Sequence, residues 1–193
     1  MNQNISHFIQ VFHNLEMPQA NQLHYKYDFS NAEDVYQLLT LGLLDFDEYM
    51  LPFILKGFHW NEVKQEFIFT VCTMDIAFLA YLHNYAIAYY GLAFIKYWLQ
   101  YENSFEVNKV SSYIAKRRFN IIIEKHDIES VINENFLSHY IAPHILDYYN
   151  LEQKKLLAHY LNIILLEQVK YEGEVCCEHE IDAFNDYWKE YLD

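Results

Sequence analysis

Glycine and proline are scarce in this chain, and their scarcity limits the folds that it can adopt. The 193 residues include four glycines and three prolines. Hairpins and many short strands depend on these residues for their turns, because glycine accepts positive φ and proline presets a turn. Apolar residues make up 53% of the chain, enough for one substantial core. We therefore predict an all-α protein, a single domain over residues 1–193, built as a helical bundle or an irregular stack of helical hairpins.

Apolar spacing predicts where the helices lie. Ile5, Phe8, Ile9, Phe12 and Leu15 recur on one helical face, so a short amphipathic helix is expected near the N-terminus. Ser30, with Glu33 three residues later, has the spacing of a capping box and predicts a helix start. Further helices are expected at 47–56, 105–124, 128–140, 151–171 and 178–191. The three isoleucines at 121–123 leave a strand at 120–123 open as an alternative.

Residues 76–95 carry no charged side chain across twenty positions, which is the length of a membrane span. However, His83, Asn84 and four tyrosines are spread through this stretch rather than gathered at its ends, where a membrane interface would place them. We expect a helix buried in a protein core, and no membrane contact. An unbroken helix over 61–100 would be about 60 Å long, so a break is expected at Leu82–Tyr85, where the polar pair interrupts the apolar stretch.

The cysteines suggest neither disulfides nor a metal site. Their number, three, is odd, and the start "MNQNISHFIQ" lacks the features of a secretory signal, so a reducing cytoplasm is expected. Zinc needs about four converging ligands. Adjacent Cys176 and Cys177 do not readily turn toward one ion, His179 adds one ligand, and Cys72 is about a hundred residues away. We expect no metal and no cofactor.

Catalytic motifs are absent from the sequence. No metalloprotease H-E-x-x-H, paired E-x-x-H, nucleophile elbow G-x-S-x-G or glycine-rich phosphate loop occurs, and "DFDE" at 45–48 lacks the glycine of a calcium loop. We therefore expect that the protein is not an enzyme. One alternative stays open: Asp75 and His83, two helical turns apart in an apolar stretch, would line a core cavity for a small ligand or a reaction.

Acidic residues gather at the C-terminus. Acidic side chains outnumber basic ones 27 to 13, and half of the net charge of −14 lies from residue 167 onward. Four carboxylates recur every four residues and would form one row on a helix, opposite an apolar stripe of Ile181, Phe184, Trp188 and Tyr191. Such a row is either a solvated face or a partner surface. The candidate partner-binding residues are Glu174, Glu178, Asp182, Asp186 and Glu190, with Asp45, Asp47 and Glu48 at a second acidic corner.

The charge also selects the kind of partner. It disfavours nucleic acid, and the one basic island, Lys116–Arg118, is expected to form internal salt bridges with Glu124 or with the acidic C-terminus. A small, acidic, helical protein without catalytic motifs resembles, as a class, the bacterial immunity proteins that neutralise toxin domains. That resemblance implies a basic protein partner, such as a nuclease toxin or effector domain. A DNA-mimicking inhibitor is a further alternative, and the sequence predicts no oligomeric state.

Overall fold

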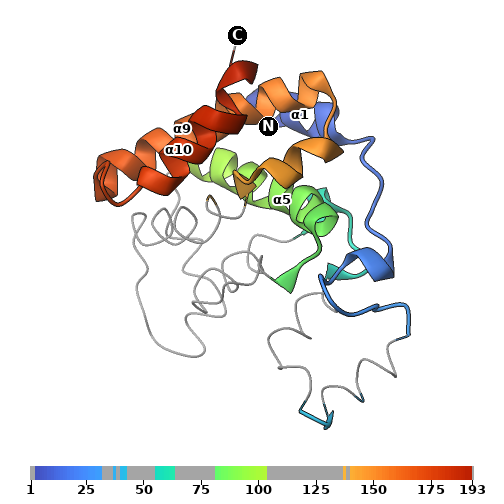
Figure 1. Ribbon diagram of the computed structural model, residues 1–193. Helices are drawn as coiled ribbons and strands as arrows, with labels where there is room; N and C mark the ends of the chain where they lie inside the picture. Colours follow the sequence, from blue (N-terminus) through green and yellow to red (C-terminus); the bar gives the residue numbers. More distant parts are fainter. Residues whose placement is uncertain are drawn as a thin grey trace, which may run out of the picture.

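The computed structural model describes residues 3–31, 37, 40–42, 55–63, 81–103, 137 and 140–192 (Figure 1). The protein is all-α and 68% helical, and the described residues contain no strand, which confirms the predicted fold class. The α-helices are α1 (Gln3–Phe12), α5 (Asn84–Asn103), α9 (Leu151–Glu172) and α10 (Glu178–Tyr187). Short 3-10 helices are η1 (Ala20–Gln22), η2 (Trp60–Glu62), η4 (Pro143–Tyr148) and η5 (Lys189–Tyr191).

Helix α5 is the buried element of the fold. It contacts α1, η1, η2 and η4, and its side chains from residue 86 to residue 95 are all buried. A helix that is apolar all round is expected to be enclosed in this way. The predicted break is also confirmed, because α5 begins at Asn84. His83 precedes it, and its Nδ1 accepts the backbone N–H of Tyr85 at 3.2 Å, which satisfies one donor of the first turn.

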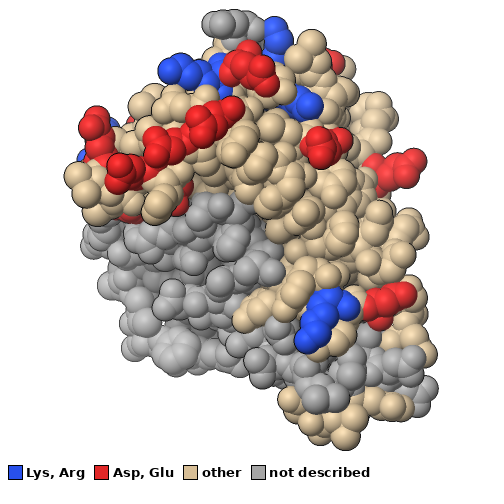
Figure 2. All heavy atoms as spheres, viewed as in Figure 1, with Lys and Arg blue, Asp and Glu red and all other residues tan. Residues whose placement is uncertain are grey.

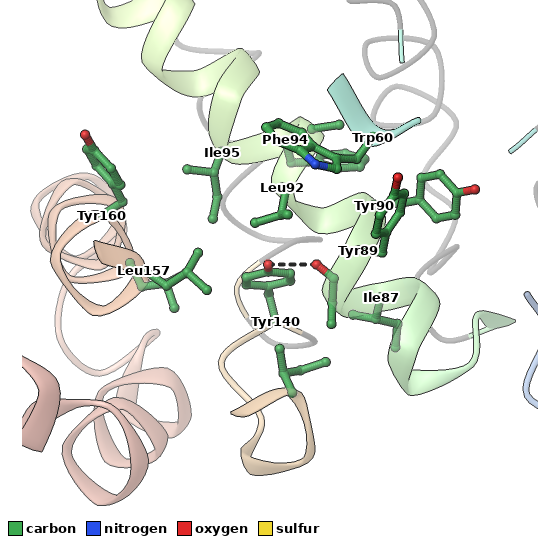
Figure 3. Close-up of a cluster of buried hydrophobic side chains, with 14 of the residues drawn as sticks. Trp60, Ile87, Tyr89, Tyr90, Leu92, Phe94, Ile95, Tyr140, Leu157 and Tyr160 are labelled. Atoms are coloured by element: carbon green, nitrogen blue, oxygen red, sulfur yellow. Dashed lines mark hydrogen bonds between the residues drawn. The ribbon is translucent and has the colours of Figure 1, made fainter. Parts of the chain in front are cut away.

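Tyr140 crosses α5 at its glycine. An added Cβ on Gly91 would lie 2.0 Å from Cε2 of Tyr140, so only glycine permits this approach. The ring is fully buried, and its hydroxyl donates to the carbonyl of Ala88 at 3.0 Å. Figure 3 shows Tyr140 reaching the backbone of α5 among the buried side chains. Tyr140 is thus held against α5 by the close fit of its ring to Gly91 and by its hydrogen bond to Ala88.

Several tyrosine hydroxyls lie inside the protein. Tyr90 donates to the carbonyl of Leu55 at 2.8 Å, and the hydroxyl of Tyr149 donates to the Tyr140 hydroxyl beside the carbonyl of Ala88. Backbone carbonyls therefore accept the hydrogen bonds that water would otherwise accept, which offsets the loss of hydration on burial. Loss of solvation raises the pKa of Tyr90 well above its ordinary value.

Helix α1 packs against the core through its apolar face. Its predicted apolar face is confirmed, with Phe8 and Phe12 fully buried. Phe8 meets Trp60 edge to face at 5.8 Å between ring centroids and Tyr160 of α9 at 5.7 Å. The indole N–H of Trp60 donates to the carbonyl of Phe12 at 3.4 Å, where the helix ends. The first helix is therefore joined to α9 and η2 through aromatic contacts.

Other predicted elements lie wholly or mainly outside the described residues. These are the helices at 47–56, 105–124 and 128–140, the helix starting at Ser30, the alternative strand at 120–123, and the basic island Lys116–Arg118. Within the described ranges, no helix combines the length and the apolar character that crossing a bilayer requires.

Candidate functional site

Helix α9 is the support for the acidic C-terminal segment. It begins with a reciprocal cap: Asn150 Oδ1 accepts the N–H of Gln153 at 3.0 Å, and Gln153 Oε1 accepts the N–H of Asn150 at 3.0 Å. The buried Gln153 also donates through Nε2 to the carbonyl of Val11 at 3.1 Å. The start of α9 is therefore fixed to the end of α1. The helix predicted at 151–171 is confirmed as Leu151–Glu172.

A glycine turn reverses the chain between α9 and α10. Gly173 has a φ of 92°, which side-chain-bearing residues rarely adopt, and its N–H donates to the carbonyl of Val169 at 2.8 Å. Two more turn bonds follow, from Cys176 N to Gly173 O and from Cys177 N to Glu174 O. In Figure 1, α10 runs back alongside α9 after this turn.

Helix α10 is docked through its apolar face. Phe184 and Trp188 are buried, and Ile181 and Tyr191 are partly buried against the same core, as the predicted apolar stripe requires. The indole N–H of Trp188 donates to the carbonyl of Ile141 at 2.7 Å. The α-helix ends at Tyr187 and the chain continues as η5, so the predicted helix 178–191 is present but divided at Trp188.

Five carboxylates of the C-terminal segment face solvent. Glu174 lies in the turn before α10, Glu178, Asp182 and Asp186 lie in α10, and Glu190 lies in η5. We call these five residues the acidic row, and all five side chains are exposed. Figure 2 shows acidic side chains gathered along α10. None of the five lies within ion-pair distance of a lysine in the described part of the chain; nearby, Lys170 instead pairs with Glu167 of its own helix at 3.9 Å. The negative potential of the row is therefore largely uncompensated by these neighbours.

A groove of about 330 Å³ lies between α9 and α10 beside the acidic row. We call it the α9–α10 groove. Its apolar lining consists of Leu165, Leu166 and Val169 from α9, with Ile181, Phe184 and Leu192 opposite. Asn162, Glu174, Asn185 and Lys189 also line it. Leu166 is 58% exposed and Leu192 is 39% exposed, although both are large apolar side chains. The groove could not be predicted from the sequence, because an apolar residue at a helical spacing indicates a core position unless the packing of the neighbouring helix is known.

The cysteines of the turn are not arranged as a reactive or metal-binding pair. Cys176 is exposed and Cys177 is buried. Burial, reinforced by Glu172 and Glu180, raises the pKa of the Cys177 thiol to about 11, so this thiol stays protonated at neutral pH. Its Sγ donates to Glu172 Oε2 at 3.9 Å. Among the described residues, no three side chains of histidine, cysteine, aspartate or glutamate converge as a metal site.

The remaining candidates are only partly described. Asp45, Asp47, Glu48 and Asp75 fall outside the described residues, as does Cys72. The second acidic corner and the cavity between Asp75 and His83 therefore stay predictions. His83 is described, and its Nδ1 caps α5.

Comparison of the chain with protein-family models, with curated proteins and with solved structures finds no match.

Proposed function

We propose that this protein is a cytoplasmic, non-enzymatic binding protein whose acidic row grips a basic protein, such as a toxin or effector domain that it neutralises. The observation that carries the proposal is the acidic row itself. Its five exposed carboxylates have no lysine partner among the described residues. Three of them, Glu178, Asp182 and Asp186, lie on α10, whose opposite face is packed against the core. Like charges at a spacing of four oppose helix formation. Carboxylates at this spacing repel one another in the free protein. They suit a surface whose positive countercharges come from another molecule.

Electrostatic reasoning defines how such a surface works. Exposed carboxylates attract a cationic partner over about 10 Å at 0.1 M salt, which speeds association and excludes acidic competitors. In a basic nuclease domain, the acidic row would occupy the cleft that otherwise receives phosphates. Specificity then comes from the match of charge positions and from short-range contacts at the centre of the interface.

The test compares three forms of the protein as bait in cells that carry its gene: the parent, a variant with Glu178, Asp182, Asp186 and Glu190 changed to lysine, and one with these four changed to glutamine. We expect the parent to capture a basic protein that the lysine variant loses. The purified pair should then show salt-sensitive binding, and the partner's activity should fall when it is bound.

A partner that binds the parent and the lysine variant equally would refute the role of the acidic row. In that case the row is a solvated face that contributes solubility. The DNA-mimic alternative makes a separate prediction, since the captured partner would then be a DNA-binding protein displaced by duplex DNA in competition.

A further inference from the structure

The α9–α10 groove gives the acidic row an apolar neighbour. We propose that this groove receives one large apolar side chain from the basic partner, while lysines or arginines beside that side chain lie over the acidic row. This inference rests on the proposed function and specifies the partner's contact motif: a leucine-sized or aromatic residue flanked by cationic residues.

The size and the lining of the groove suit one side chain. Its volume of about 330 Å³ is enough to hold a leucine or an aromatic side chain. Leu165 and Phe184 are almost fully buried and form its apolar base, whereas Leu166 and Leu192 stay exposed beside them. An apolar side chain placed there would remove both exposed leucines from water, which is favourable in proportion to the area covered.

The groove and the acidic row are adjacent on α10. Ile181 and Asn185 line the groove, and Asp182 and Asp186 each follow one residue later. Consecutive helical residues are about 100° apart, so the carboxylates lie roughly a quarter of a turn from the groove. Glu174 belongs to both features, since it lines the groove at the end next to the turn. A segment lying on the groove therefore has cationic neighbours within reach of the carboxylates.

Two synthetic lysine-rich peptides, identical except for a central leucine or serine, test the inference by fluorescence anisotropy at low ionic strength. We expect the leucine peptide to bind about tenfold more tightly, which corresponds to about 1.4 kcal/mol. Leu166→Asn should remove this preference and leave the affinity of the serine peptide unchanged. Leu151→Asn is the matched control, because Leu151 is 61% exposed on the same helix but does not line the groove.

The outcomes separate the groove from the acidic row. If both peptides bind the parent equally and the four-glutamine variant weakens both, the groove proposal fails while the role of the acidic row stands. A leucine preference that survives Leu166→Asn also overturns the groove proposal. If neither peptide binds the parent at low salt, the groove proposal and the proposed function both fail.

Discussion

Gly91 occupies the position in α5 where the ring of Tyr140 passes closest to the helix backbone. Glycine in a helix interior is ordinarily less favourable than alanine by about 1 kcal/mol. At this position alanine is instead expected to destabilise the protein, because its Cβ would overlap the ring of Tyr140, which is fully buried. Gly91→Ala should lower the free energy of unfolding by about 1–3 kcal/mol, the usual penalty of overpacking. Urea denaturation, monitored by circular dichroism, measures this change in the free energy of unfolding.

The control for this substitution is a double-mutant cycle. With Tyr140→Ala in place the overlap is gone, so adding Gly91→Ala should stabilise the protein slightly, as helix propensity dictates. A stabilising effect of Gly91→Ala alone would show that Tyr140 moves aside at little cost.

Tyr89 gives stability a dependence on alkaline pH. Burial raises its pKa from 10.0 to about 12. A tyrosine whose pKa is higher in the folded chain than in the unfolded chain stabilises the fold fully below pH 10, and this contribution is lost as the pH rises through 12. Tyr89→Phe should therefore flatten the fall of the unfolding free energy above pH 10, by up to about 1.4 kcal/mol per pH unit. Denaturation curves at several pH values test this, and identical slopes would count against it.

At the scale of elements, the cap of α9 links two helices. Asn150→Ala removes one capping bond and should cost about 1 kcal/mol. Gln153→Ala should cost more, because it removes the other half of the cap and also leaves the carbonyl of Val11 without its donor. Asn150→Asp keeps the acceptor and should leave stability nearly unchanged. Equal effects of the two alanine substitutions in chemical denaturation would mean that the link to α1 contributes nothing.

Trp188 is the apolar anchor of α10. It is fully buried and bonded to Ile141, so Trp188→Ala should destabilise the protein by roughly 3–5 kcal/mol. Hydrogen exchange should show the amides of α10 losing protection before those of α5. The neighbouring Tyr187 is 38% exposed, and Tyr187→Ala serves as the control with a small effect. Unchanged protection of α10 in Trp188→Ala would show that other contacts hold this helix.

Among the described elements, sequence periodicity predicted the long helices well and the short elements poorly. The bounds of α9 followed from sustained apolar spacing ended by Gly173, and the start of α5 followed from the polar pair at 83–84. The 3-10 helices η2 and η4 were not predicted, because three to six residues carry too little periodic signal. The Asn150 cap had a readable signal in the glutamine three residues later, and this signal was overlooked.

At the scale of the whole molecule, the candidate site was half predictable. The sequence placed the acidic row opposite an apolar stripe, and the structure has these carboxylates exposed and the stripe packed. The α9–α10 groove was not predictable, because it depends on how closely two helices approach and on which leucines their side chains leave uncovered. Local patterns determine which face of α10 is charged; tertiary packing determines what lies beside that face.

Four carboxylates of the acidic row contribute more than a quarter of the net charge of −14. Changing Glu178, Asp182, Asp186 and Glu190 to glutamine moves the formal charge from −14 to −10, and changing them to lysine moves it to −6. All four side chains are exposed, so both variants should fold, with a melting temperature equal to or slightly above that of the parent because repulsion between like charges is reduced.

Against the purified basic partner, the glutamine variant should associate more slowly with a weaker salt dependence, and the lysine variant should not bind. Stopped-flow association rates at several salt concentrations measure this. Because electrostatic steering acts before contact, the change should lie mainly in the association rate; a change confined to dissociation would place the carboxylates in short-range contacts instead.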